Sequence, residues 1–207
     1  MKLPLRQRGE TLIGLLVGLS LGLVVLTAGS QMLAQLVRGH RTALQDSHVQ
    51  QDLHFAIDLM ERELQDAQYV AGAWATRSPT VCTDPFCDGN KDFGLGDARL
   101  HWSLDRNHNG VQDNDECTGL RVRSGALQVR TACTPEVWSA LTDTASLQVT
   151  RLQASLQCRL VAGWWRRHVQ LQIEASIPGA DGRSIAVART VHLRNPLPQG
   201  TPVRYCP

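Results

Sequence analysis

The first strong pattern along the chain is an unbroken apolar run near the N-terminus. No charged residue stands between Glu10 and Arg38, and residues 11–37 are rich in Leu, Val and Gly. A helix needs about 20 apolar residues to cross the hydrocarbon core of a bilayer. The run therefore predicts one membrane-spanning helix.

A short basic flank sets the expected orientation of this helix. Lys2, Arg6 and Arg8 precede the run, which favours a cytoplasmic N-terminus with the rest of the chain outside. The alternative is an ordinary secretory signal that is removed after export. The apolar core of such a signal is only about 7–15 residues, and no small-x-small cleavage site clearly ends this run before residues 28–30. We therefore expect the segment to be retained.

Beyond the membrane run, apolar positions recur at steps of three and four, with no proline between Leu5 and Ser78. This stripe consists of Val49, Leu53, Ala56, Ile57, Met60, Leu64 and Ala67. It predicts an amphipathic helix. The simplest interpretation is one helix from about Glu10 to Ala67, on the order of 85 Å long. Its stripe must be covered by sequence further along the chain, because such a helix does not persist in water on propensity alone.

After Trp74 the period of the pattern changes from helix to strand. Apolar and polar residues alternate over 169–177 and nearly so over 185–193, which predicts a β-hairpin with one buried face. Another strand is expected from Leu147 towards Cys158. A shorter hairpin turns at Ser124-Gly125, which sets Val122 opposite Leu127 and Leu120 opposite Val129. These segments predict an α+β fold in which an antiparallel sheet covers the helix.

Composition narrows the class of protein. A length of 207 residues allows one domain with an appendage or two small domains. The formal charge of +2 does not favour a generic nucleic-acid binder, and the composition excludes a disordered or collagenous chain. Trp164-Trp165-Arg166-Arg167 is either a tip that contacts a partner or DNA, or a loop whose tryptophans pack on the sheet and whose arginines are solvated. The second interpretation is favoured, so nucleic acid is not an expected partner.

The join between the basic flank and the apolar run reads Arg6-Gln7-Arg8-Gly9-Glu10-Thr11-Leu12. It resembles the prepilin signal of type IV pilins and type II secretion pseudopilins. The resemblance implies that a prepilin peptidase cuts between Gly9 and Glu10, on the cytoplasmic side, and methylates the new N-terminus. The apolar helix then stays in the mature protein.

Two positions depart from the family pattern. The first mature residue is usually a large apolar one and here is Glu10. The fifth is usually a Glu thought to pair with the N-terminal amine of a neighbouring subunit, and here is Gly14. Two hypotheses follow: Glu10 partly replaces the missing acid, or the subunit occupies a place, such as a filament tip, where no pairing is required.

Three glycines repeat every four residues along the apolar helix: Gly14, Gly18 and Gly22. Small residues at this spacing let helices approach closely in lipid. Glycine is also simply common in membrane helices. We favour packing against the helices of other pilins.

The water-borne half of the helix also resembles one branch of the family. Residues 51–69 are similar to the corresponding region of PilW-type minor pilins, where a charged helix ends in an L-x-x-A-x-Y pattern, here Leu64 to Tyr69. The resemblance implies four parts. They are a leader (1–9), a transmembrane and filament-core helix (10–37), an amphipathic continuation (38–70) and a β-rich head (71–207).

Six cysteines lie on the predicted outer side of the membrane, where an even count argues for disulfides. They are Cys82, Cys87, Cys117, Cys133, Cys158 and Cys206. Cys117 and Cys133 close the open end of the short hairpin, one residue out of strict register. Six cysteines allow 15 connectivities, which the sequence leaves open. In the one we favour, Cys82 pairs with Cys87 and Cys158 with Cys206. A metal site is the alternative, but the spacing lacks CxxC and paired His.

An acidic loop carries the sharpest chemical signal. Residues 105–116 fit the calcium-loop pattern D-x-[DN]-x-[DN]-G-x5-E at every specified position. The expected oxygen donors are Asp105, Asn107, Asn109, Val111 through its carbonyl, Asp113 and Glu116. The motif predicts a structural Ca²⁺ site with a dissociation constant of about 10⁻⁴–10⁻³ M. The alternative is a metal-free polar turn, since Asn, Asp and Gly also build such loops.

With these features, the resemblance implies a non-catalytic PilW-type minor pilin that initiates or caps type IV pilus assembly. It is expected in the inner membrane with a periplasmic head, and then at the tip or base of the pilus. Its expected partners are other minor pilins, the major pilin and a tip adhesin. One alternative is a J-type pseudopilin of type II secretion. Another is a membrane-anchored calcium-dependent binding or enzyme domain outside the filament, although no phosphate loop, G-x-S-x-G elbow or zincin motif is found.

Overall fold

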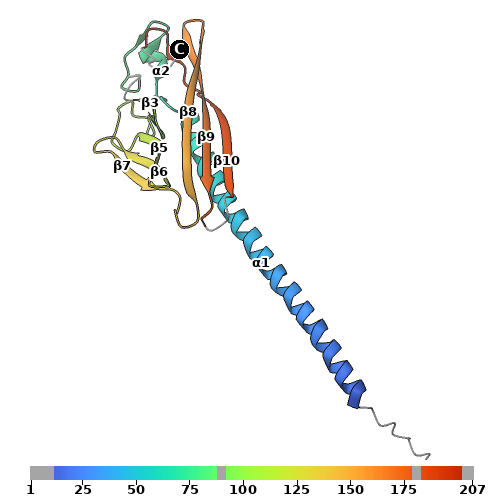
Figure 1. The fold of residues 1–207 in the computed structure, drawn as a ribbon. Helices are drawn as coiled ribbons and strands as arrows, with labels where there is room; N and C mark the ends of the chain where they lie inside the picture. The colour runs from blue at the N-terminus through green and yellow to red at the C-terminus, as the bar shows by residue number, and fades with distance from the viewer. Residues whose placement is uncertain (1–11, 88–91, 179–182, 202–207) are drawn as a thin grey trace, which may run out of the picture. The chain divides into compact units, whose positions relative to one another are not determined.

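A computed structural model of the chain describes residues 12–87, 92–178 and 183–201, without the side chains of residues 41, 42, 45 and 46. The chain divides into two compact units with their boundary between His48 and Val49. Helix α1 (Leu12–Gln65) contributes to both units (Figure 1). The two units are described separately below.

The described part of the first unit is the N-terminal portion of α1. Its segment Leu12–His40 is long and apolar enough to cross a membrane, judged by length and composition. The large apolar side chains along it are exposed, from Leu12 to Val37. An exposed apolar surface of this length is what a single-pass membrane anchor presents to lipid. The predicted cleavage point, Gly9 and Glu10, lies outside the described residues.

In the second unit, the remainder of α1 buries the predicted stripe. The stripe residues within α1 are all buried, namely Val49, Leu53, Ala56, Ile57, Met60 and Leu64, and so is Ala67 just after the helix. Phe55 and Leu59, which fall between them, are exposed. The helix ends at Gln65, two residues before the predicted end, and Gln68 takes a left-handed conformation with φ of 58°. The prediction of an amphipathic helix is confirmed.

Five strands form one antiparallel sheet in the head. They are β3 (Phe93–Gly96), β4 (Arg99–Ser103), β5 (Cys117–Arg123), β6 (Ala126–Ala132) and β7 (Val137–Ala140), in this spatial order. The β5–β6 hairpin has the predicted register, with Val122 opposite Leu127 and Leu120 opposite Val129. Ser124 and Gly125 at its turn both have positive φ, as a tight hairpin turn of this kind requires.

A second antiparallel sheet contains the long strands. They are β8 (Gln148–Val161), β9 (Trp164–Ser176), β10 (Ser184–His192) and the short β11 (Leu197–Pro198). Strand β9 pairs with β8 along one side and with β10 and β11 along the other. Val191 lies opposite Val169 and Val187 opposite Ile173, so the predicted hairpin is confirmed. Gly163, at the turn between β8 and β9, has a φ of 82°.

A small region joins the end of the long helix to these sheets. It consists of the short helix α2 (Ala73–Thr76) and a two-stranded ribbon of β1 (Arg77–Ser78) and β2 (Val81–Cys82). Arg77 pairs with Cys82 across the ribbon. The peptide bond between Thr134 and Pro135 is cis.

The predicted α+β, pilin-like architecture is confirmed, and the antiparallel strands expected to cover the helix are divided between more than one sheet. The head has two larger sheets and a ribbon, which Figure 1 shows as separate groups of strands. Alternation in a sequence shows which face of a strand is buried, but it does not show the sheet to which the strand belongs. Both sheets turn their apolar faces to one hydrophobic core shared with α1, containing for example Leu53, Leu120 and Ile173.

Candidate functional site

The predicted helix-packing face is open in the structure. Gly14, Gly18 and Gly22 all lie within α1. At Gly18 and Gly22, no described atom outside the adjoining helix backbone lies within 4 Å of the place that a Cβ would take. A glycine stripe with nothing packed on it allows another helix to approach the backbone closely.

The acidic loop at residues 105–116 is built around two buried carboxylates. Asp105 is fully buried, and its carboxylate accepts hydrogen bonds from the backbone N–H of Ala71 (2.8 Å), Asn109 (3.0 Å) and Gly110 (3.0 Å). The N–H of Ala71 belongs to the segment just after α1. Asp105 therefore ties the loop to the end of the long helix.

The second carboxylate closes the loop from its other end. Glu116 is 1% exposed and accepts the backbone N–H of Arg106 (2.7 Å), Asn107 (3.3 Å) and Asp113 (2.9 Å). The Arg106 guanidinium donates to Glu63 on α1 at 3.0 Å, which adds a link to the helix. The two carboxylates thus satisfy backbone donors that a tight loop leaves unpaired.

The loop contains a donor set suitable for calcium, but hydrogen bonds already engage side-chain oxygens of this set. The side-chain nitrogens of Asn107 and Asn109 both donate to Asp113 Oδ2, at 2.7 and 2.8 Å. Their side-chain oxygens accept the backbone N–H of Asn109 and Val111. Six oxygen donors in one loop match the coordination number that Ca²⁺ takes. A bound cation would require both amides to turn their oxygens inward.

Two of the three predicted disulfides are confirmed. Cys82 is bonded to Cys87, and Cys117 is bonded to Cys133. Cys158 is also in a disulfide, and its predicted partner, Cys206, lies outside the described residues. The Cys82–Cys87 pair has Asp84 between its members, but sulfurs joined to each other supply no thiolate for a metal ion.

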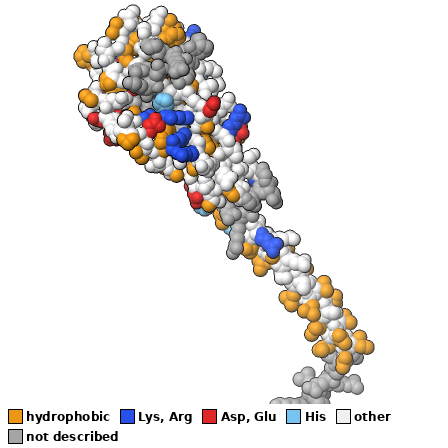
Figure 2. Space-filling view, turned by 60° about the vertical axis from the view of Figure 1, so that its left-hand side comes forward, with side chains coloured by type: hydrophobic (Ala, Val, Ile, Leu, Met, Phe, Trp, Pro, Cys, Tyr) orange, Lys and Arg blue, Asp and Glu red, His pale blue; other side chains and the backbone are white. Residues whose placement is uncertain are grey.

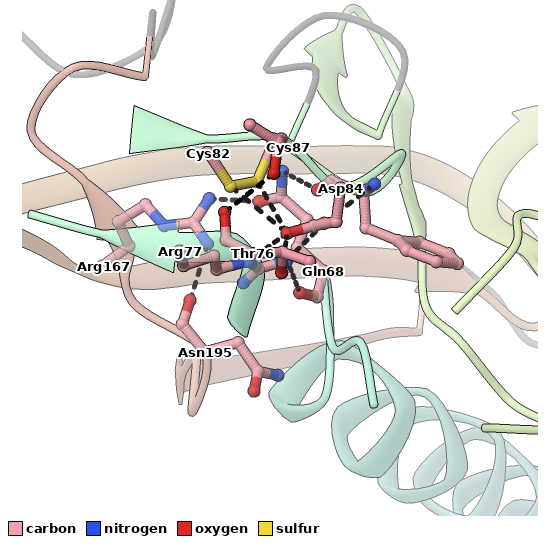
Figure 3. Close-up of a disulfide and its surroundings, with 10 residues drawn as sticks. Gln68, Thr76, Arg77, Cys82, Asp84, Cys87, Arg167 and Asn195 are labelled. Carbon is pink, nitrogen blue, oxygen red and sulfur yellow. Dashed lines mark hydrogen bonds and ion pairs between the residues drawn. A yellow bond between two sulfur atoms is a disulfide. The ribbon is translucent and has the colours of Figure 1, made fainter. Parts of the chain in front are cut away.

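A buried polar cluster surrounds this first disulfide, and nothing in the sequence analysis identified it (Figure 3). Arg77 donates to both oxygens of Asp84, at 2.8 and 2.9 Å, and their side chains are 4% and 2% exposed. Thr76 and the backbone N–H of Phe86 also donate to Asp84. Burial alone would raise the pKa of Asp84, but the hydrogen bonds and charge of Arg77 outweigh it and lower that pKa.

Arg167 is the second buried cation of the cluster. Its guanidinium donates to the side-chain oxygen of Gln68 at 2.5 Å and to the carbonyl of Asn195 at 3.0 Å, and it lies 5.6 Å from the ring centre of Phe93. Burial, and secondly the charge of Arg77, lower the pKa of Arg167 to about 9. It is therefore still charged at neutral pH. Asp84 is the carboxylate that pairs with Arg77 in this cluster.

The run from Trp164 to Arg167 lies at the start of β9 and does not form a free tip. Trp164 and Trp165 are half-buried and paired with both β8 and β11. Arg166 is exposed, whereas Arg167 is buried in the polar cluster. The favoured interpretation, in which the tryptophans pack on the sheet, agrees with these positions. The expectation of a solvated arginine holds for Arg166 and is wrong for Arg167.

Comparison with known proteins gives one informative match. The family model described as "Prepilin peptidase-dependent protein B" matches residues 42–193, which is well over half of the chain. The matched region contains α1 from residue 42 onwards, strands β1 to β10, the acidic loop and the polar cluster apart from Asn195. No curated protein and no solved structure matches the chain.

Proposed function

The chain belongs to the prepilin peptidase-dependent protein B family, and on that premise we propose that it is a PilW-type minor pilin. In this role it is a non-catalytic subunit that initiates or caps type IV pilus assembly. Its membrane helix packs with the helices of other minor pilins and of the major pilin. Its head then presents a surface to them or to a tip adhesin.

One observation carries this proposal: a single helix supplies both the apolar segment and part of the core of the head. Helix α1 includes the apolar segment Leu12–His40 and continues without a break to Gln65. Its last part buries Leu53, Ile57 and Leu64. A tether that only anchored the head would not need to be continuous with the core of the head. A filament subunit needs this continuity, because a force on the membrane helix must be transmitted to the head.

The proposal includes a maturation step at the N-terminus. The prepilin peptidase removes residues 1–9 and leaves a methylated Glu10 at the start of a helix in the inner membrane, with the head in the periplasm. The helix face that carries Gly14, Gly18 and Gly22, open at Gly18 and Gly22, then contacts neighbouring helices.

N-terminal mass spectrometry tests the maturation step. In cells that contain the peptidase, we expect a mature chain that begins with methylated Glu10. Cells without the peptidase, and a Gly9→Val variant in normal cells, serve as controls and should keep the full leader. A mature chain that begins beyond residue 30 would contradict the proposal, because the helix needed for packing would be missing.

Site-specific crosslinking tests the packing face. A Gly18→Cys variant should form disulfide-linked species with cysteine-bearing helices of co-expressed minor pilins. Leu16→Cys is the matched control, since two residues along a helix turn the side chain by about 200°. Equal crosslinking from both positions would argue against a defined packing face.

The two departures from the family pattern can be tested in the same assembly system. If Glu10 replaces the missing acid, Glu10→Phe lowers incorporation into pili and adding Gly14→Glu restores it. Unchanged incorporation of both single variants would instead indicate a subunit that needs no such pairing.

A J-type pseudopilin of type II secretion is the nearest alternative, since it shares the membrane helix and pilin-like head. Copurification after crosslinking distinguishes the two: pilus subunits support the minor pilin, and secretion pseudopilins support the alternative. A membrane-anchored calcium-dependent binding or enzyme domain would show neither partner and no peptidase dependence.

We also propose that the loop at residues 105–116 binds Ca²⁺ weakly as a structural ion. Support comes from the sequence pattern of the loop and from the nearness of three candidate donor side chains, since the amides of Asn107 and Asn109 both contact Asp113. Millimolar Ca²⁺ should raise the melting temperature of the full chain in detergent above its value in chelator, and Asp113→Asn should remove most of the rise. Asp113 is preferred for this test because Asp105 and Glu116 also hold the backbone. An unchanged melting temperature would identify the loop as a metal-free turn.

A further inference from the structure

The outward face of the five-stranded sheet carries a group of arginines whose placement follows from the strand register. Arg99 in β4 lies directly opposite Arg121 in β5, and Arg123 lies two residues further along the same strand. Their neighbours Leu100 and Leu120 are buried in the core. Because side chains alternate between the two faces of a strand, all three arginines lie on the face turned away from the core.

Trp138 in β7 holds two of these guanidinium groups. The guanidinium carbon of Arg121 is 4.3 Å and that of Arg99 is 5.2 Å from the centre of the Trp138 ring. Arg121 also donates to Gln128 at 2.7 Å. Cation–π contacts and hydrogen bonds fix the positions of long side chains that would otherwise be mobile, which reduces the entropy that a partner must offset on binding.

The charges on this face are unbalanced. We define the arginine face as Arg99, Arg121, Arg123, Arg130, Glu136 and Trp138. Glu136 is its one carboxylate, and Arg99 and Arg130 lie 2.6 and 3.4 Å from it. Four cations therefore share one anion within this set. Figure 2, which brings the side of the head with the five-stranded sheet forward, shows basic side chains gathered together with acidic ones beside them.

The crowding of positive charge has an electrostatic cost. Desolvation, and then the charges of Arg123 and Arg99, lower the pKa of Arg121. Like charges directly opposite each other on neighbouring strands destabilise a sheet. An anionic group of a partner that contacts the face would reduce this repulsion. This reduction adds to the binding free energy that the direct contacts supply.

A groove beside the arginines gives an anionic group a place to bind. It has a volume of about 500 Å³ and is lined by Arg99, Arg130, His101 and Glu136, with Gly96 and Thr134 among the other residues. The contact of Arg99 with Glu136 shows how a carboxylate sits against this face. The carboxylate there accepts hydrogen bonds from Arg99 and from the Trp138 ring nitrogen.

We infer that the arginine face is a docking surface for a carboxylate-rich segment of another protein. Arg and Trp are the side chains that most often dominate protein–protein binding energy. Single-stranded nucleic acid usually binds basic surfaces that also offer open aromatic rings for base stacking. Here the Trp138 ring is already engaged by Arg99 and Arg121, which favours a carboxylate partner over a nucleic acid. This inference does not depend on the proposed role in pilus assembly.

Binding of defined polyanions to the purified full chain in non-ionic detergent tests the inference. The probes are poly-L-glutamate and an oligothymidylate with the same number of charges. The test variant is Arg121→Gln with Arg123→Gln. The matched control is Arg159→Gln with Arg166→Gln, which removes an exposed pair of arginines that also lie opposite each other on neighbouring strands.

We expect poly-L-glutamate to bind the unmodified chain with an affinity that falls as salt is added. The test variant should bind about tenfold more weakly, and the control should stay within about twofold of the unmodified chain. Glu136→Gln should bind more tightly, because it removes the one carboxylate that competes for Arg99 and Arg130. This opposite effect cannot come from loss of folding.

Three results would overturn the inference. The first is no binding of poly-L-glutamate at low salt. The second is an equal loss of binding in the test variant and the control. The third is tighter binding of the oligothymidylate than of poly-L-glutamate, which would identify a nucleic-acid surface instead. Pilus assembly plays no part in this experiment, so its outcome is separate from that of the N-terminal processing test.

Discussion

The side-chain oxygen of Gln68 accepts a hydrogen bond from Arg167, 99 residues further along the chain. Gln68 is fully buried just beyond the end of α1, and each of its other polar groups also has a partner. Its side-chain nitrogen donates to the carbonyl of Phe86, its backbone N–H donates to Ser103, and its carbonyl accepts from Arg77. One residue thus connects the end of the long helix with both sheets and the ribbon.

The cluster around Gln68 should depend on Asp84. Asp84→Asn removes the carboxylate that Arg77 contacts through two hydrogen bonds and leaves this buried cation without its counter-ion. Removing one partner of a buried ion pair costs about 3–5 kcal/mol. Chemical denaturation of the full chain in detergent would measure the loss. Arg151→Gln is the matched control, since its contact with Glu174 is exposed and is worth less than about 1 kcal/mol. Equal losses in the two variants would refute this account of the cluster.

The same carboxylate predicts how stability depends on pH. The pKa of Asp84 is lowered in the fold from an ordinary value of 3.8. A lowered pKa means that the unfolded chain binds the proton more tightly, so the contribution is complete above the ordinary pKa and is lost as the pH falls through the folded one. The difference in melting temperature between the unmodified chain and Asp84→Asn should be constant from about pH 6 to 8 and shrink below about pH 4. A difference that stays constant down to pH 2 would contradict this assignment.

The packing of α1 on the head predicts very different losses of stability for substitutions at two nearby positions. Leu53 is fully buried in the core, whereas Phe55 is 72% exposed. Leu53→Ala should cost about 2–5 kcal/mol in unfolding free energy, because it removes buried methyl groups and leaves a cavity. Phe55→Ala should change it by less than about 0.5 kcal/mol. Thermal unfolding followed by circular dichroism separates the two, and a larger loss in Phe55→Ala would mean that this part of the helix packs by another face.

Two glycines in the head provide another matched pair. A Cβ at Gly200 would collide with the backbone carbonyl of Thr80, whereas a Cβ at Gly96 would have nothing within 4 Å. Gly200→Ala should therefore destabilise the chain by about 1–3 kcal/mol, since backbone on one side cannot move aside easily. Gly96→Ala should be close to neutral. The difference between their melting temperatures is the measurement, and equal values would show that the contact between Gly200 and Thr80 is not tight in solution.

Much of the fold could be predicted because its signals are local. The steps of three and four from Val49 to Ala67 predicted the buried face of α1, and all seven residues are buried. The position of Ser124-Gly125 predicted the register of the β5–β6 hairpin, because a tight turn and a buried face leave few pairings. The Cys117–Cys133 disulfide followed from the same register.

The buried cluster could not be predicted in this way. Arg77 and Asp84 are seven residues apart in a stretch without clear periodicity. Arg167 belongs to a run that the sequence analysis interpreted as a loop with solvated arginines. One signal was available: in β9, Arg167 stands two residues before Val169 and so falls on the inward face of the alternation. To predict that Arg167 is buried, one would also have needed the position of its hydrogen-bond partner Gln68. That position is set by the end of α1.

The sequence by itself determined the elements that depend on neighbours along the chain: the apolar helix, its amphipathic continuation and the hairpins. The tertiary structure alone decided how the strands divide between two sheets, that Arg167 is buried beside Arg77, and that Arg99 and Arg121 meet across neighbouring strands around Trp138. The physical reason is that periodicity and turn chemistry act over a few residues. Charge pairing and sheet membership depend instead on groups that come together only when distant segments pack.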